Sequence, residues 1–141
     1  MKLTSDKTQE QQGRRFLSFS CSAQEIEFLN TKSFQDALGD LWECKSGIRL
    51  YAPILINKDE VLIEVQQSMN GRMDNEFINF VLLCFRTKNL ISSDLTNQIY
   101  SQVEQIIGKK SPLEKILPWM QKYHPGLVTE DFAIARVRPK V

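Results

Sequence analysis

The sequence has few glycines and prolines and no long apolar run, and each shortage excludes a class of protein. Only 6 of the 141 residues are glycine and 5 are proline, which excludes collagen-like and low-complexity chains. The longest uninterrupted apolar run, residues 80–85, covers six positions, whereas a membrane-spanning helix needs about 20. We therefore predict no transmembrane segment. Because residues 1–15 also lack the apolar stretch of a secretory signal, the predicted location is cytoplasmic.

Motifs that carry common enzyme chemistry are missing as well. The glycines are never closer than eight positions, so no glycine-rich loop can wrap a phosphate group. Residues 108–111, GKKS, differ from the end of a nucleotide-binding loop, which requires Ser or Thr directly after the first lysine. His124 is the only histidine, and we expect it to cap a helix end or face solvent. We predict that the chain is not an enzyme and has no catalytic residue, no metal site and no cofactor.

The positive and negative charges nearly balance, which makes nucleic acid a less favoured partner for the chain as a whole. A formal net charge of +1, from 18 basic and 17 acidic residues, lacks the large positive excess typical of nucleic-acid-binding proteins. Residues 96–141 differ from the rest because they hold seven basic and four acidic residues. This local excess favours an anionic partner for the C-terminal end.

The three cysteines, Cys21, Cys44 and Cys84, are separated by 23 and 40 positions and include no C-x-x-C pair. A chain of this length can bury a core without disulfides, and Cys84 lies inside the apolar run. We therefore predict reduced structural thiols. A zinc site formed by the three thiols and His124 is the alternative that the sequence leaves open.

The first residues are too polar to predict ordered structure. Residues 1–13 contain only Met1 and Leu3 as large apolar side chains. Such a segment cannot bury enough apolar surface to offset the entropy lost on ordering. We predict a disordered tail over 1–13 and a single domain over 14–141.

Three local signals follow this segment. Residues 15–21 alternate between the two faces of a strand. Ser22 and Glu25 have the spacing of a capping box and predict the start of a short helix. A second helix is predicted from Ser33, with a core-facing stripe formed by Phe34, Ala37, Leu38, Leu41 and Trp42.

The central third is predicted to be mainly strand. Residues 48–56 and 61–67 form two strands around a four-residue loop, and Pro53 confines the first strand to a sheet edge or a bulge. We expect the side chain of Glu64, inside the second strand, to be exposed to solvent. Residues 76–87 are apolar almost throughout, which fits a buried strand or a buried helix. We favour a strand, because three consecutive strands then form an antiparallel meander.

The C-terminal third returns to a helical pattern. A helix is predicted over 95–106 and ends at Gly108. Ser111 caps a second helix, which Pro118 should kink or split. A last strand is predicted over 131–138. Together these elements predict an α+β fold, a mainly antiparallel sheet made of the central three-strand meander plus flanking strands, with helices packed on one face.

Two groups of residues are candidates for a binding surface. The first is aromatic and lies near the end of the last helix. It consists of Trp119, Met120, Tyr123 and His124, and we take Trp119 and Tyr123 as its binding candidates. Met120 and Tyr123 continue the apolar stripe, so core packing is the favoured explanation for these two, whereas Trp119 lies off the stripe and would suggest contact with a partner if it is exposed. The second group is basic and consists of Arg136, Arg138 and Lys140 together with Lys109 and Lys110. This second group suits phosphates or an acidic protein surface, although a solvated strand face explains its two arginines equally well.

The favoured hypothesis is a non-enzymatic, small intracellular binding module that acts as an adaptor, a chaperone or an accessory subunit of a larger assembly. Its partner is then another protein or a second copy of the chain, and no membrane is involved. The alternative is an accessory nucleic-acid-binding subunit, which contacts phosphates through the basic C-terminal strand and an aromatic such as Phe132 or Trp119. An enzyme without a local motif is the third possibility.

Overall fold

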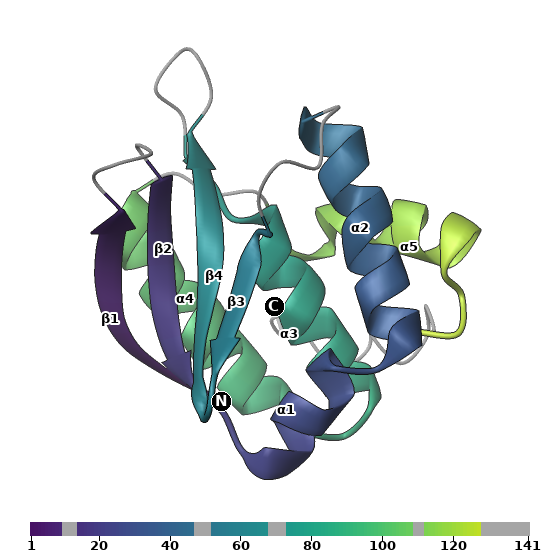
Figure 1. The fold of residues 1–141 in the computed structure, drawn as a ribbon, viewed down its shortest axis with the longest axis horizontal. Helices are drawn as coiled ribbons and strands as arrows, with labels where there is room; N and C mark the ends of the chain where they lie inside the picture. Colours follow the sequence, from purple (N-terminus) through teal and green to yellow (C-terminus); the bar gives the residue numbers. More distant parts are fainter. Residues whose placement is uncertain (10–13, 47–51, 68–72, 109–111, 128–141) are drawn as a thin grey trace.

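The computed structural model describes residues 1–9, 14–46, 52–67, 73–108 and 112–127. These residues form an antiparallel sheet with helices packed on one face (Figure 1), which confirms the predicted α+β class. The sheet order is β1-β2-β4-β3, and a short β5 pairs with β4. The strands are β1 (Lys2–Gln9), β2 (Arg14–Ser20), β3 (Ile54–Asn57), β4 (Glu60–Gln67) and β5 (Met73–Asp74). The helices are α1 (Ala23–Leu29), α2 (Lys32–Ser46), α3 (Glu76–Thr87), α4 (Ser93–Ile107), the 3₁₀ helix η2 (Leu113–Ile116) and α5 (Leu117–Tyr123).

The first residues form an edge strand, so the prediction of a disordered tail over residues 1–13 is wrong for Lys2–Gln9. β1 pairs with β2 in antiparallel register, and the backbone hydrogen bonds of this pairing do not depend on apolar side chains. Edge strands often carry charged and polar residues. At the start of β1, the terminal ammonium of Met1 lies 2.8 Å and 2.9 Å from the two carboxylate oxygens of Glu25. This segment is therefore ordered by backbone pairing with the next strand and by an ion pair with α1.

The predicted strand and the two predicted helices that follow it are confirmed. Leu17 and Phe19 of β2 belong to the hydrophobic core. The Ser22 hydroxyl accepts a hydrogen bond from the Glu25 backbone N–H, and the Glu25 carboxylate accepts one from the Ser22 N–H, so a capping box starts α1. The stripe of α2 is buried throughout, at Phe34, Ala37, Leu38, Leu41 and Trp42.

The central hairpin is present, but its loop is shorter than predicted. Only Lys58 and Asp59 separate β3 from β4, and Lys58 takes the left-handed φ of 57° that the tight turn requires. β3 lies at an edge of the sheet directly after Pro53, which agrees with the expectation for a proline here. Of the strand predicted over 48–56, residues 48–51 lie outside the described part of the chain.

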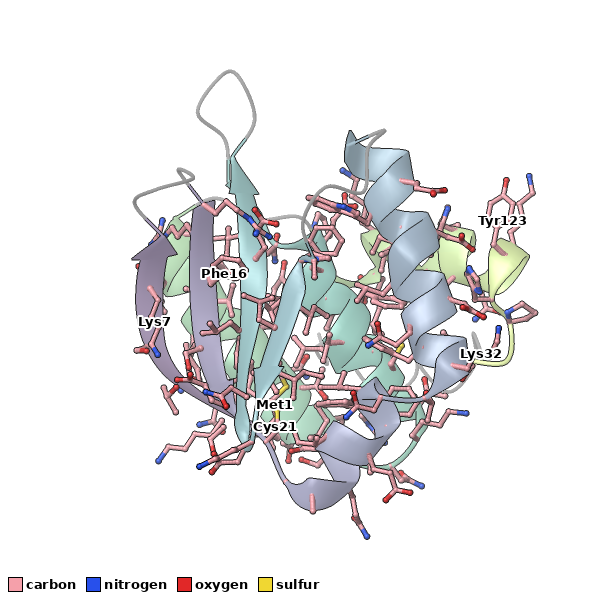
Figure 2. All side chains as sticks on the ribbon, in the orientation of Figure 1. Met1, Lys7, Phe16, Cys21, Lys32 and Tyr123 are labelled. Atoms are coloured by element: carbon pink, nitrogen blue, oxygen red, sulfur yellow. The ribbon has the colours of Figure 1, made fainter. Side chains whose placement is uncertain are left out.

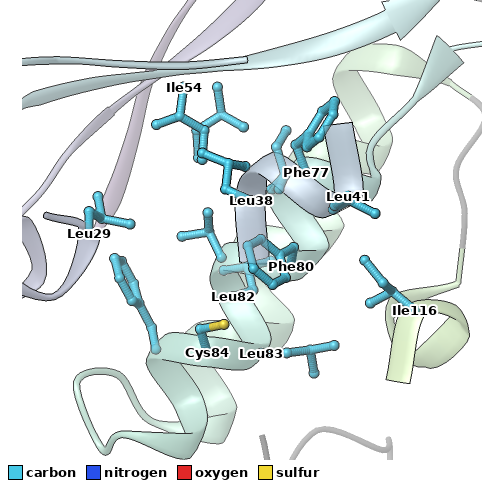
Figure 3. Packing of buried hydrophobic residues seen from close by; sticks show 14 of the residues in the cluster. Leu29, Leu38, Leu41, Ile54, Phe77, Phe80, Leu82, Leu83, Cys84 and Ile116 are labelled. Carbon is cyan, nitrogen blue, oxygen red and sulfur yellow. The ribbon is translucent and has the colours of Figure 1, made fainter. Parts of the chain in front are cut away.

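The apolar segment 76–87 is the helix α3, so the predictions of a strand here and of a three-strand meander are wrong. All residues from 77 to 86 are buried, since the sheet, α4, η2 and α2 surround the helix (Figures 1 and 3). Phe80 stacks on Phe34 of α2 with ring centroids 5.1 Å apart. Because the run is apolar at almost every position, its pattern fits a buried strand as well as a buried helix. Its length of 12 residues was the signal that favours a helix over a strand.

The helices of the C-terminal third agree with prediction where the structure describes them. α4 ends at Gly108, which takes a φ of 76°. The following helix is split as expected into η2 and α5, and Pro118 lies in the first turn of α5, where its missing N–H costs no hydrogen bond. His124 caps the end of α5. Ser111 and the predicted strand 131–138 lie outside the described residues.

Candidate functional site

α5 is anchored to the core at a few positions, which fixes the direction of its remaining side chains. Leu117 and Met120 are buried, and so is Leu127 in the loop after the helix. The ammonium of Lys88 donates a hydrogen bond to the carbonyl of Gly126 at 3.2 Å, which joins this loop to the end of α3. The C-terminal end of α5 is therefore fixed both by buried side chains in the helix and by the hydrogen bond between the following loop and the end of α3.

Trp119 and Tyr123 lie together on α5, but their exposures are the reverse of those expected. Tyr123 is 56% exposed and points away from the body of the molecule (Figure 2), whereas Trp119 is half-buried against the core. Their ring centroids are 5.9 Å apart. The other members of the expected stripe, Leu113, Ile116, Leu117 and Met120, are all buried, so the stripe ends one turn earlier than expected, before Tyr123 at the last position of α5.

The side of α2 that faces α5 carries three carboxylates. Asp36, Asp40 and Glu43 are spaced by four and three residues and therefore lie along one side of the helix. The side chains of Asp36 and Asp40 are 57% and 51% exposed. At one end of this row, the Lys32 ammonium donates a hydrogen bond to Asp36 at 2.6 Å. The row gives this side of α2 a negative charge.

His124 connects α5 to α2 across 84 positions of sequence. Its Nε2 atom lies 2.9 Å from Oδ2 of Asp40, and its ring centroid lies 5.3 Å from that of Trp119. The imidazole is mostly covered, with 17% of its side-chain surface exposed. The position at a helix end agrees with the sequence, and the contact with α2 gives this histidine a structural role.

Two adjacent hollows lie between α2 and α5 and share Asp40. The first has a volume of about 550 Å³ and is lined by Ser33, Asp36, Asp40, His124, Gly126 and Leu127. The second has a volume of about 420 Å³ and is lined by Asp40, Glu43, Trp119 and Tyr123. We refer to both together as the α2–α5 groove. Each has the size of an ordinary ligand site, roughly 300–1,000 Å³, and the second combines two carboxylates with two aromatic rings.

The groove contains a hydroxyl, an imidazole and a carboxylate, but they do not form a catalytic triad. Within the described residues, the Ser33 hydroxyl contacts the Thr31 hydroxyl at 3.5 Å and makes no hydrogen bond to His124. A serine nucleophile needs a base within hydrogen-bond reach. Within the described part of the chain, Ser33 therefore does not complete a triad with His124 and Asp40.

The two cysteines whose side chains are described lie outside the groove and are buried as free thiols. Burial raises the pKa of Cys21 to about 12, and burial also raises the pKa of Cys84. Neither thiol therefore forms an appreciable amount of reactive thiolate near neutral pH. In the part of the chain that the structure describes, no group of three or more His, Cys, Asp or Glu residues is placed to hold a metal ion.

Glu64 is buried, so the expectation that it faces solvent is wrong. Its two carboxylate oxygens accept hydrogen bonds from Nε and Nη2 of Arg14, each at 3.0 Å. The guanidinium of Arg14 also lies 4.7 Å from the ring centroid of Phe16. Arg14 and Phe16 both belong to β2, which pairs with β4, the strand that carries Glu64. This two-point ion pair compensates the burial of the carboxylate, and it lies outside the groove.

The basic candidates Lys109, Lys110, Arg136 and Arg138 lie outside the described residues. The nucleic-acid alternative depends on them and stays a prediction. None of the helices in the described ranges is both long enough and apolar enough to cross a lipid bilayer.

The acidic side of the groove was not predicted. The spacing of Asp36, Asp40 and Glu43 on the polar side of α2 was visible in the sequence, but their approach to α5 was not.

Comparison of the chain with protein-family models, with curated proteins and with solved structures found no match. The functional inference therefore rests on the groove itself.

Proposed function

We propose that this protein is a small intracellular, non-enzymatic binding module, acting as an adaptor, a chaperone or an accessory subunit of a larger assembly, and that the α2–α5 groove holds its protein partner. The supporting observation is Tyr123, which is 56% exposed beside the half-buried Trp119 at a concave surface. Tyrosine and tryptophan are enriched among the residues that dominate binding energy at protein interfaces. They bury a large apolar area and keep a polar group for hydrogen bonding.

The chain offers a matched control for this surface. Leu55, on the edge strand β3, is the other large apolar side chain that is exposed among the described residues, at 38%. It does not line the groove. A partner that binds any exposed apolar side chain would respond to both positions, whereas a partner that occupies the groove responds to Tyr123 alone.

Native purification of the full chain followed by mass measurement tests the proposal. We expect the unsubstituted protein to be recovered in a complex of defined mass. Tyr123→Ala and Trp119→Ala should each weaken the complex by about 2 kcal/mol or more, roughly 30-fold, because both truncate rings at the contact surface. Leu55→Ala should leave the complex intact.

Two results would overturn the proposal. One is recovery of the unsubstituted chain alone at every concentration, and the other is equal release of the partner by Leu55→Ala and Tyr123→Ala. Binding of RNA or duplex DNA that falls steeply with salt would instead support the nucleic-acid alternative.

A further inference from the structure

We infer that His124 is a positioning residue, which holds the second hollow of the α2–α5 groove in shape while the partner binds to the side chains of Trp119 and Tyr123. This inference rests on the proposed function and adds the residue that organises its surface. Four of the described residues line the second hollow, and His124 is not one of them. It lines the adjacent first hollow instead.

The imidazole of His124 connects the two walls of the second hollow. Its Nε2 atom lies 2.9 Å from Oδ2 of Asp40, which lines that hollow from α2. Its ring centroid lies 5.3 Å from that of Trp119, which lines the same hollow from α5, and rings at this separation attract each other. One side chain therefore contacts a residue on each wall, and its contacts fix the two walls relative to each other.

The backbone of His124 fixes the end of α5. Its N–H donates a hydrogen bond to the carbonyl of Met120 at 2.8 Å and closes the last turn, which carries Tyr123. Its carbonyl accepts a hydrogen bond at 3.1 Å from the N–H of Leu127, a buried residue. Because the backbone is held on both sides of the imidazole, the ring is a fixed support for its neighbours.

The imidazole is better placed to support the binding surface than to contact a partner. Only 17% of its side-chain surface is exposed, whereas Tyr123 is 56% exposed. Binding side chains keep their geometry where packing and hydrogen bonds from neighbouring residues hold them, and a looseness of about 1 Å is enough to lose function. His124 supports Asp40 and Trp119 through its ring and Tyr123 through the helix end.

Quenching of Trp119 emission tests the positioning role without a partner. The chain has two tryptophans, and Trp42→Phe leaves Trp119 as the only one, with an aromatic ring still packed against Phe77. In this background, His124→Ala should raise the acrylamide quenching constant of Trp119 about twofold, because the indole loses a ring that covers it. His124→Gln should raise it less, since its amide nitrogen can keep the contact with Asp40.

Native purification of the full chain tests the effect on the partner. His124→Ala should weaken the complex about tenfold and His124→Gln about threefold or less, because the first loses both side-chain contacts and the second keeps one. The matched control is Lys88→Ala, which removes another polar contact at this end of α5, the hydrogen bond to the carbonyl of Gly126. Lys88 lines neither hollow, so the control should leave the complex intact.

Two results would overturn the inference. One is a complex that His124→Ala weakens no more than Lys88→Ala does. The other is release of the partner by His124→Ala with no change in the quenching of Trp119, because His124 would then contact the partner directly. Should circular dichroism show that His124→Ala does not fold, His124→Phe replaces it. This variant keeps a ring beside Trp119 and loses the contact with Asp40, and it too should weaken the complex more than Lys88→Ala.

Tyr123→Ala separates this inference from the proposed function in the same purification. If Tyr123→Ala releases the partner and His124→Ala does not, the groove binds the partner but His124 does not position it. If neither variant releases the partner, the proposed function fails and the inference fails with it.

Discussion

α3 and α5 are both rich in apolar and aromatic residues, yet the fold uses them in opposite ways. Every residue of α3 from 77 to 86 is buried, whereas α5 buries only Leu117 and Met120 and leaves Tyr123 at the surface. In α3, packing accounts for every large side chain. In α5, the side chain of Tyr123 and part of that of Trp119 stay exposed at the surface. Because core packing does not require this exposed aromatic surface, it is the better candidate for binding a partner.

Thiol reactivity should show the largest difference between the two helices. Burial raises the pKa of Cys84 in α3, so its thiolate fraction at pH 8 is very small. A thiol placed in the exposed position by Tyr123→Cys should react with a disulfide reagent roughly 10³-fold faster or more. The measurement uses a Cys44→Ser background, with the unfolded protein as the control for full reactivity. Rates within tenfold of each other would contradict the account.

The buried Cys21 extends this prediction to pH. With a pKa of about 12, its reactivity in the folded protein should keep rising with pH well beyond pH 9. An ordinary cysteine, with a pKa of about 8.5, reaches a plateau there. A plateau near pH 9 for a Cys84→Ser, Cys44→Ser variant would show that Cys21 is not held in a desolvated site.

Truncation in α3 should cause the largest loss of stability. Phe80 is fully buried and stacks on Phe34. Phe80→Ala should therefore lower the free energy of unfolding by about 3–5 kcal/mol, since it removes the buried ring and leaves a cavity. Chemical denaturation followed by circular dichroism measures this loss. A loss below about 1 kcal/mol would mean that α3 is not at the centre of the core.

Within α5, truncation should separate the packed residue from the exposed one. Met120 is fully buried, so Met120→Ala should cost about 2–5 kcal/mol in the free energy of unfolding. The same denaturation experiment applies. If Met120→Ala cost no more than a surface substitution, α5 would not be docked on the core, and the groove would have no fixed wall.

Tyr123→Ala should cause the smallest loss of stability, within about 0.5 kcal/mol, because an exposed side chain contributes little to folding. This near-neutral result is needed for the binding experiments, since the variant must remain folded when it loses the partner. A destabilisation comparable to that of Met120→Ala would show that Tyr123 belongs to the core after all.

Local signals predicted the elements that depend on nearby residues. The Ser22–Glu25 capping box, the buried stripe of α2 and the end of α4 at Gly108 were all visible in the sequence. The prediction of a strand for α3 is wrong because almost every position of the segment is apolar, and such a run fits a buried strand as well as a buried helix. β1 was missed because backbone pairing with β2 orders it, rather than apolar side chains.

The sequence predicted only part of the groove, because the two sides of the groove come from segments that are far apart along the chain. Trp119 and Tyr123 were singled out by residue type and position, and the acidic row on α2 had a readable spacing. Their meeting depends on the contact between Asp40 and His124, 84 positions apart, and on how α5 docks. Neither this contact nor the docking of α5 can be inferred from residues that are neighbours in the sequence.

Site-specific photo-crosslinking in cells tests most directly whether the α2–α5 groove is the partner-binding surface. A photoreactive benzoylphenylalanine is placed at Tyr123 in one variant and at Leu55 in another, the two large apolar positions that are exposed among the described residues. We predict an adduct of defined mass from position 123 and none from position 55. An adduct from position 55 with none from position 123 would contradict the account, because the partner would then contact the edge of the sheet instead of the groove.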